Sequence, residues 1–352
     1  MSGIIPPQNQ FWHRNTNSVS LRTLTCHQNP DRPTRSINES NPMLKKSFLS
    51  GAALMATLAA PPAIAQQFKP SILKVNTIRG GAYWLSGGVA NSGFVVGDKG
   101  VIVIDTQVGP PDAKAAISEI GKVTPKPINA IIVSHGDPDH IGGLLAYPAD
   151  AAIIEHEGTQ PYVLSAANDA ARGGPFGALF LGLVKRPPTR TIGNTETVTV
   201  DGVRMVLMHL APAHTDGDLV IYLPAQKTVF AADVLLTSQR FPVIHYGGSS
   251  LGWLATMKAM LALNADTYIP GHGPIESKAK LQARLRDVEQ VREQIKAMVR
   301  EGKTVAEVQT AIPEAASPFP TFVETIYREL TVGYPATTPP WANIVRPELM
   351  RR

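Results

Sequence analysis

The sequence predicts a mixed α/β (α+β) fold, in which two mixed β-sheets face each other and helices cover their outer sides. Short runs of β-branched and other apolar residues, bounded by Gly, Pro and Asp, recur between residues 72 and 269, which is typical of buried strands. Segments with the apolar spacing of a helix lie between some of these runs, as in strand–helix–strand crossovers. Other runs follow one another directly, as in β-meanders. Because meanders occur at two places in the chain, we expect two sheets.

The elements of the first half follow from this apolar pattern. Val101–Ile104 consists of four β-branched residues, so it predicts a buried strand. Pro110-Pro111-Asp112 marks a helix start, because proline and an acidic residue favour the first helical turn. Residues 172–196 are rich in Gly and Pro and are expected to form an irregular lid or pocket wall. We expect strands within 72–75, 94–96, 101–104, 130–133 and 152–154, and helices over 110–120 and 159–171.

The second half contains the second meander and ends in helices. Leu251–Leu263 has amphipathic helical spacing, and the pattern after residue 275 is helical only. A helical extension over 276–352 is therefore expected to pack on a domain of residues 70–275. Packing on a second copy of the chain is the alternative, so the sequence leaves the oligomeric state open. We expect strands at 197–200, 203–210, 219–223, 228–231 and 267–269, and C-terminal helices to residue 300 and at 305–312 and 322–330.

Composition and charge describe an ordinary globular protein. The 352 residues are 43% hydrophobic, and the mean hydropathy is close to zero. The formal net charge of +5 is concentrated in residues 1–65, which carry six Lys or Arg and two acidic residues. The remainder holds 27 basic and 26 acidic residues, so nothing indicates binding to nucleic acid or to an anionic membrane surface.

The first 65 residues have the composition of a leader. Residues 43–65 comprise Lys45-Lys46, an apolar segment too short to span a bilayer, and Ala63-Ile64-Ala65, which are the three parts of a secretory signal peptide. Residues 1–42 are expected to be disordered and to reflect a misassigned translation start. We expect Sec-type export to the bacterial periplasm or medium, with no stable membrane span after cleavage; an uncleaved anchor is the alternative. Cleavage would remove Cys26, the only thiol.

The stretch from Ser134 to Gly143 holds the densest set of potential metal ligands. Two imidazoles and two carboxylates fall within six residues directly after a predicted strand: His135, Asp137, Asp139 and His140. Both groups are metal ligands, and Pro138 and the nearby glycines restrict the loop as a rigid site requires. The alternative is a solvated polar loop with helix-capping aspartates.

Further candidates stand at strand ends or in the loops that follow: Asp105, His214, Asp233 and His272. Strand ends converge on one edge of a sheet, where sheet-based folds build ligand sites. Four of the seven histidines after residue 65 stand in Gly-, Pro- or Asp-rich loops after strands, which favours a common site over chance. His156 and His209 are expected to be ordinary polar or core residues.

In this order, the candidates resemble the five motifs of the metallo-β-lactamase-fold hydrolase superfamily. The resemblance covers about residues 72–275 and implies a four-layer αβ/βα sandwich with a dinuclear metal site at one edge. It implies that Asp233 bridges the two ions and that Asp105 is a structural group behind the ligands. By the same resemblance, one ion is held by His135, Asp137 and His214, and the other by Asp139, His140 and His272.

One residue departs from the superfamily pattern, because Asp137 stands where histidine is usual. Aspartate binds zinc at a similar distance, so two Zn²⁺ ions remain the expected cofactors. Its harder, charged oxygen favours Fe or Mn more than imidazole does, and some diiron relatives carry a carboxylate here. A weakened or vacant first site, in a mononuclear or inactive protein, is the alternative.

The expected activity is hydrolysis of a small-molecule substrate. A water between two dications becomes hydroxide near neutral pH, and a carbonyl oxygen bound to one of them is stabilised as it gains charge. Asp139 is the expected catalytic residue, which orients the hydroxide and passes a proton to the leaving group. Esters, lactones, thioesters and lactams all suit this chemistry. The alternatives are a nonheme diiron protein with redox or oxygen chemistry and a degenerate metal-binding protein without catalysis.

The sequence says less about the substrate pocket. With Asp233 as the bridging group, the chain resembles the lactonase, glyoxalase-like and general hydrolase branches of the superfamily. A mature chain without cysteine cannot belong to the branches that use a Cys ligand. His245, Tyr246 and Trp253 follow Asp233 at a pocket-forming distance, and they either bind substrate or serve as packing residues.

Overall fold

The computed structural model describes residues 71–170, 176–315 and 320–333. The predicted signal peptide, the segment before it and Cys26 lie outside these ranges, as do parts of the predicted C-terminal extension. Among the described residues, none of the helices combines the length and the apolar character that crossing a bilayer requires.

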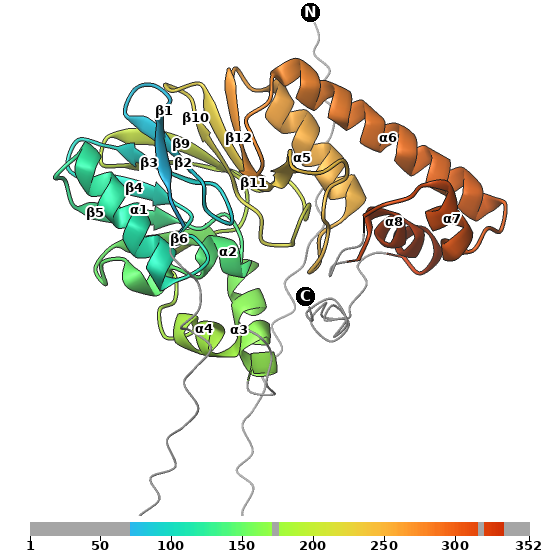
Figure 1. Ribbon diagram of the computed structural model, residues 1–352, viewed down its shortest axis with the longest axis horizontal. Helices are drawn as coiled ribbons and strands as arrows, with labels where there is room; N and C mark the ends of the chain where they lie inside the picture. The colour runs from blue at the N-terminus through green and yellow to red at the C-terminus, as the bar shows by residue number, and fades with distance from the viewer. Residues whose placement is uncertain (1–70, 171–175, 316–319, 334–352) are drawn as a thin grey trace, which may run out of the picture. The chain divides into compact units, whose positions relative to one another are not determined.

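The first sheet has seven strands, and their spatial order is their order in the chain (Figure 1). The strands β1 to β4 form an antiparallel meander, and β4 to β7 run parallel to one another. The strands are β1 Lys74–Thr77, β2 Ala82–Ser86, β3 Ser92–Val96, β4 Val101–Ile104, β5 Ile128–Ile132, β6 Ala152–His156 and β7 Arg190–Ile192.

The second sheet has five strands in the order β12-β11-β10-β9-β8. Strands β8 to β11 form the second antiparallel meander, and β12 runs parallel to β11. Both sheets are therefore mixed, as predicted. The strands are β8 Glu196–Val200, β9 Val203–Met208, β10 Val220–Leu223, β11 Thr228–Leu236 and β12 Thr267–His272.

Alternate residues of the central strands face two different apolar layers. In β4, Ile102 and Ile104 point into the layer between the sheets, whereas Val101 and Val103 pack under helices on the outer side. Phe230 of β11 enters the inner layer from the second sheet. Because such strands are buried on both faces, their sequences are unbroken apolar runs without polar alternation.

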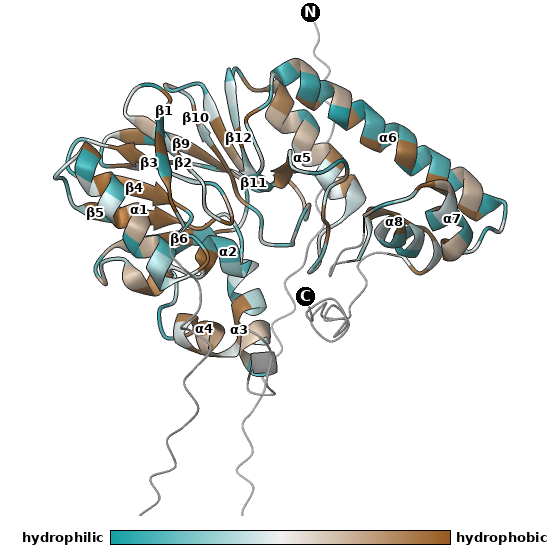
Figure 2. Ribbon diagram, viewed as in Figure 1, coloured by the Kyte–Doolittle hydropathy of each residue, from teal (hydrophilic) through white to brown (hydrophobic). Residues whose placement is uncertain are grey.

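Helices cover the outer face of each sheet (Figure 1). One apolar cluster joins the first sheet to α1 (Pro110–Val123), α3 (Thr159–Ala170) and α4 (Gly177–Leu183). Another joins the second sheet to α5 (Ser250–Ala262), α6 (Lys278–Arg300), α7 (Val305–Ala311) and α8 (Phe322–Thr331). Figure 2 shows hydrophilic residues along α6, on the outside of this layer. The helix–sheet–sheet–helix arrangement confirms the predicted four-layer sandwich.

Local sequence signals fix several helix starts. Helix α1 begins with Pro110 and Pro111 and carries Asp112 in its first turn, as predicted. Helices α7 and α8 begin with capping boxes, in which Thr304 and Thr321 exchange hydrogen bonds with the glutamate three residues later.

The expectation of an irregular segment over 172–196 is wrong for much of its described part. Helix α4 packs Phe180 and Leu183 into the outer cluster of the first sheet, and β7 adds a parallel strand beside β6. Strand β7 has only three residues, two of them exposed, so it lacks the apolar run by which a buried strand is detected.

Candidate metal centre

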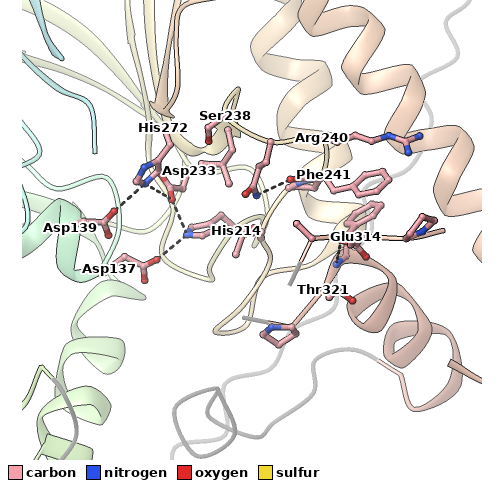
Figure 3. A pocket seen from close by; sticks show the side chains of 18 residues that line it. Asp137, Asp139, His214, Asp233, Ser238, Arg240, Phe241, His272, Glu314 and Thr321 are labelled. Carbon is pink, nitrogen blue, oxygen red and sulfur yellow. Dashed lines mark hydrogen bonds and ion pairs between the residues drawn. The ribbon is translucent and has the colours of Figure 1, made fainter. Parts of the chain in front are cut away.

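Seven His and Asp side chains converge at one edge of the sandwich. Four come from the segment that follows β5, where the short helix α2 (Pro138–Ile141) begins directly after Asp137. Three come from the second sheet and its loops: His214 between β9 and β10, Asp233 in β11 and His272 at the end of β12 (Figure 3). The structure therefore brings together all seven residues predicted as ligands.

Asp233 reaches the centre because β11 is irregular. The pairing of β11 with β12 shifts register on both sides of Ala232, whose φ is +44°. A Cβ atom at Gly271 would lie 1.8 Å from Asp233 Oδ1, so only glycine leaves room for this carboxylate. The strand continues to Leu236 and thus carries Asp233 inside it, not at its end as the sequence predicts.

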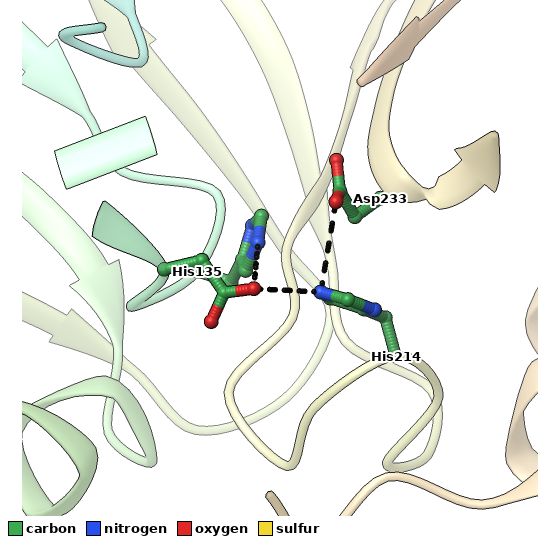
Figure 4. Close-up of side chains that lie close together, drawn as sticks. His135, His214 and Asp233 are labelled. Atoms are coloured by element: carbon green, nitrogen blue, oxygen red, sulfur yellow. Dashed lines mark hydrogen bonds and ion pairs between the residues drawn. The ribbon is translucent and has the colours of Figure 1, made fainter. Parts of the chain in front are cut away.

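A first group consists of His135, Asp137, His214 and Asp233, whose ligand atoms all lie within 4.8 Å of one another. Asp137 Oδ2 is 3.1 Å from His214 Nε2 and 3.5 Å from His135 Nε2. Figure 4 shows His214 beside Asp233, where Nε2 and Oδ2 are 3.7 Å apart. All four residues are buried.

A second group consists of Asp139, His140 and His272. Asp139 Oδ2 lies 3.0 Å from His272 Nε2. Asp233 also contacts this group, because its Oδ1 is 3.0 Å from His140 Nε2 and its Oδ2 is 3.5 Å from His272 Nε2. The carboxylate of Asp233 therefore lies between the two groups, where a bridging ligand is expected.

Hydrogen bonds behind the ligands orient three imidazoles. The Nδ1 atoms of His214 and His140 lie 2.8 Å from the carbonyl oxygen of Val243 and from Asp105 Oδ2. These oxygens only accept hydrogen bonds, so both Nδ1 atoms carry a proton and the Nε2 lone pair of each neutral ring is left for a ligand role. His135 Nδ1 is oriented in the same way by the hydroxyl of Ser134 at 2.9 Å.

Asp105 joins these outer contacts. Its Oδ1 accepts the backbone N–H of Ser134, and its Oδ2 accepts both the Ser134 hydroxyl and the Nδ1–H of His140, all at 2.8 Å. Asp105 therefore lies behind His135 and His140, in the position that the sequence analysis gives to a structural group.

The buried charges shift one another's pKa values. Burial lowers the pKa of His214 and of His272, but neighbouring carboxylates raise them more, to about 9 and about 10. Burial would raise the pKa of Asp233, yet the surrounding imidazoles, His140 first, hold it well below its usual range. The buried carboxylates are therefore ionised, and they require a positive charge next to them.

Divalent cations fit this cluster. The Nε2 atom of His135 is buried and has no hydrogen-bond partner within the described part of the chain, as is expected of a metal ligand. A cation bound by both imidazoles and carboxylates neutralises the carboxylate charge, and the imidazoles then stay neutral. The described residues offer enough imidazole and carboxylate donors for two ions that share Asp233.

A cavity of about 650 Å³ opens in front of the cluster (Figure 3). One side consists of candidate ligands: Asp137, Asp139, His214, Asp233 and His272. The opposite wall comes from the segment after β11 and from residues near the start of α8, where the rings of Phe241 and Phe322 stack with centroids 5.1 Å apart. The guanidinium group of Arg240 is held by both carboxylate oxygens of Asp287.

The candidate pocket residues lie elsewhere. None of His245, Tyr246 and Trp253 is among the residues that line this cavity, and a substrate-binding role for them stays a prediction. Trp253 is buried under the second sheet and donates its indole N–H to the carbonyl of Val234, because α5 packs its apolar face there. His245 instead contacts Asp137, with Nε2 3.0 Å from Oδ2.

The cavity wall and the role of Tyr162 could not be predicted from the sequence. The Tyr162 hydroxyl donates to Asp137 Oδ1 at 2.6 Å. Tyr162 lies in a helix with apolar spacing, so a core position is the expectation for it. His156 and His209 stack on each other with ring centroids 3.7 Å apart, and neither belongs to the two groups of candidate ligands.

Comparison with known proteins adds a family model and several relatives. The model described as the metallo-beta-lactamase superfamily matches residues 85–272. The alpha subunit of a 2,4-dinitroanisole O-demethylase from Nocardioides sp. (strain JS1661) is 27% identical over 215 residues, which are 60% of each chain. A linear primary-alkylsulfatase from Pseudomonas sp. (strain ATCC 19151) is 24% identical over 225 residues, 53% of this chain and 42% of the relative.

Solved structures show the same fold. A stereoselective inverting sec-alkylsulfatase from Pseudomonas sp. superposes with a TM-score of 0.60 at 19% identity, covering 80% of this chain and 52% of that one. A metallo-beta-lactamase from Pontibacter korlensis superposes with a TM-score of 0.50 at 20% identity, covering 62% and 99%. The chain spans 60% and 42% of the two curated relatives' lengths.

Proposed function

Because the chain belongs to the metallo-β-lactamase superfamily, we propose that it is a metal-dependent hydrolase that binds two divalent ions and cleaves a small ester-like or lactam-like molecule. One observation carries this proposal. Imidazoles whose Nδ1 protons are committed to outer partners direct Nε2 toward carboxylates in two adjoining groups, with Asp233 between them.

The residues divide into two sets of ligands. The first set is His135, Asp137 and His214, the second is Asp139, His140 and His272, and Asp233 is shared. When bound, two divalent ions supply an activated water and polarise a substrate oxygen. Asp139 faces the cavity with a side chain that is 21% exposed, so it can hold a proton on the substrate side and deliver it to a leaving group.

The cavity supports a substrate with an apolar substituent. Its wall opposite the ligands is mostly apolar, with proline and phenylalanine side chains on both contributing segments. Carboxylic esters, lactones, thioesters and lactams all carry the carbonyl that the centre would act on. The names of two relatives add an alkyl sulfate and 2,4-dinitroanisole to the compounds worth assaying.

Zinc is the proposed metal. The number of carboxylates among the candidate ligands also suits iron or manganese, and it supports a second candidate function. Three of the seven candidate ligands are carboxylates, Asp137 among them, and oxygen donors suit iron better than an all-imidazole set does. A nonheme diiron protein with redox or oxygen chemistry is the second candidate.

Metal analysis and a substrate panel test the proposal together. The protein after export, purified without added metal, should contain two zinc ions per chain, whereas two irons would favour the diiron candidate. The dizinc protein should hydrolyse at least one ester, lactone, thioester or chromogenic β-lactam faster than a variant with Asp233→Ala and His140→Ala. If it cleaves none of them, nor the alkyl sulfate or ether, above that control, the hydrolase proposal fails.

We also propose that the protein acts in the bacterial periplasm or medium. The three-part leader in residues 43–65 supports this. Mass spectrometry of the protein from the source cell should find Gln66 at the N-terminus, and an intact Met1 would contradict the assignment.

A further inference from the structure

We infer that His245 and Tyr162 fix the carboxylate of Asp137 as a metal ligand, so that the three side chains together replace the histidine usual at this position. The inference rests on the proposed function only in that the centre binds metal. His245 and Tyr162 are positioning residues, because they act on the metal through Asp137.

Each oxygen of Asp137 has a partner that is not one of the candidate ligands. The Tyr162 hydroxyl donates to Oδ1 at 2.6 Å, and His245 Nε2 lies 3.0 Å from Oδ2. Oδ2 also lies 3.1 Å from His214 Nε2, but the proton of that neutral ring is committed to Val243 through Nδ1. Because a carboxylate only accepts hydrogen bonds, the donor to Oδ2 is then the Nε2–H of His245. Both partners are buried, with Tyr162 1% and His245 6% exposed. The two contacts are therefore not exchanged for contacts with water.

Two separate donors remove the freedom that an aspartate otherwise has. The terminal torsion of aspartate is broad, so the carboxylate of an unsupported side chain turns easily. Here Oδ1 is held from α3, on the side of the first sheet, and Oδ2 from a loop of the second sheet. The held orientation directs Oδ2 toward His135 and His214, the other candidate ligands of the first group.

One loop segment orients two ligands at once. The carbonyl of Val243 accepts the Nδ1–H of His214, and the backbone N–H of His245 donates to the carbonyl of His214 at 2.8 Å. The His245 and His214 rings meet edge to face, with centroids 4.6 Å apart. Residues 243–245 therefore hold His214 by the backbone and Asp137 by a side chain.

The sequence beside Asp137 also fits this arrangement. A Cβ atom at Gly136 would lie 2.3 Å from the Tyr162 ring, so glycine lets the ring approach closely enough for its hydroxyl to reach Oδ1.

Geometry assigns His245 a supporting position rather than a ligand position. The ligand atoms of His135, Asp137, His214 and Asp233 form a set within 4.8 Å, and His245 is not a member of that set. Its side chain contacts members of that set through the hydrogen bond to Asp137 and the edge-to-face contact with the His214 ring. A group in this place sets the orientation of a ligand and the strength with which it binds.

The test measures Zn²⁺ affinity, without any substrate. His245→Phe keeps the ring but removes the donor, Tyr162→Phe removes only the hydroxyl, and His245→Gln restores an N–H donor. His209→Phe is the matched control, because this histidine lies outside the cluster. Each protein is titrated with Zn²⁺ against a competing chelator, and metal content is counted after dialysis.

We expect His245→Phe and Tyr162→Phe each to weaken one of the two Zn²⁺ sites by roughly 10- to 100-fold, the usual effect of losing a hydrogen bond behind a ligand. The other site should keep its affinity, His245→Gln should recover part of the loss, and His209→Phe should match the unchanged protein. In an Asp137→His background, His245→Phe should change the affinity less than threefold, because the carboxylate it supports is absent.

Two results would overturn the inference. One is unchanged affinity at both sites in both phenylalanine variants. The other is loss of one imidazole from the metal shell of His245→Phe in X-ray absorption spectra, which would make His245 a ligand. Circular dichroism of each variant identifies any that fails to fold, and His245→Gln then decides the question. An inert dizinc protein with the expected affinities would contradict the proposed function and leave this inference standing.

Discussion

Removal of metal should make the stability of this protein fall as the pH rises above neutrality. In the metal-free protein, His214 and His272 have pKa values of about 9 and about 10, above the roughly 6.5 of an unfolded histidine. Burial lowers both, but Asp137 and Asp233 raise the pKa of His214 more, and Asp233 and Asp139 do the same for His272. Groups with raised pKa values stabilise the fold fully below pH 6.5 and lose that contribution as the pH passes the folded-state values.

The size of the effect follows from His214. Its side chain is 2% exposed, so screening by solvent is small. A shift from about 6.5 to about 9 corresponds to about 3 kcal/mol of unfolding free energy. His272 is 23% exposed and shares Asp233, so it adds less than its own shift implies. For a protein of this size, 3 kcal/mol lowers the unfolding midpoint by roughly 6–12 °C.

Thermal unfolding at a series of pH values between 6 and 10 measures this effect. The chelator-treated protein should lose roughly 6–12 °C across the range, whereas the zinc-loaded protein should not show this loss, because ligand imidazoles stay neutral. Other titrating groups are common to both samples. Asp233→Asn, which removes a carboxylate shared by the imidazoles, should flatten the metal-free curve. A metal-free midpoint that is level or rises between pH 6.5 and 10 would refute the reasoning.

Three substitutions test other parts of the structure. Gly271→Ala puts a Cβ 1.8 Å from the present position of Asp233 Oδ1, so it should displace this carboxylate and reduce bound zinc to one ion or less; two ions by elemental analysis would contradict this. Asp105→Asn should weaken zinc binding by roughly 10- to 100-fold in chelator titrations while the fold persists, and unchanged affinity would count against its role behind the ligands. Glu329→Gln, which loses a charged acceptor of the Ser250 backbone N–H, should cost about 1.5–3 kcal/mol in urea unfolding, and a change near zero would contradict it.

The candidate ligands could be predicted because each carries a local sequence signal. His135 to His140 follow an apolar run that only a buried strand explains, and His214 and His272 stand in turn-forming segments. The position of Asp233 is harder to predict, because its strand continues beyond it and the register shift at Ala232 directs its side chain toward the metal centre. The register shift depends on the approach of Gly271 from the neighbouring strand, and this contact is not encoded near Asp233.

The surroundings of the ligands could not be predicted, because they depend on contacts between distant segments. Tyr162 and His245 lie 25 and 108 positions from Asp137, and neither has a motif that would connect it with this carboxylate. The cavity wall likewise pairs Phe241 with Phe322, two aromatic residues that each look like ordinary core positions. Packing of the two layers against each other, and not local pattern, decides what the centre faces.

The exchange of histidine for Asp137 also affects which substrate the centre attracts. Two divalent ions among the carboxylates of Asp137, Asp139 and Asp233 leave one net positive charge, whereas histidine at position 137 would leave two. Arg240 adds little positive charge to the cavity, because Asp287 holds its guanidinium group in an ion pair. We therefore expect the attraction for an anion such as an alkyl sulfate to be weaker than with histidine at position 137. A neutral ester, lactone or lactam with an apolar substituent matches both the charge and the cavity wall, and in the substrate panel such compounds should react faster than the alkyl sulfate.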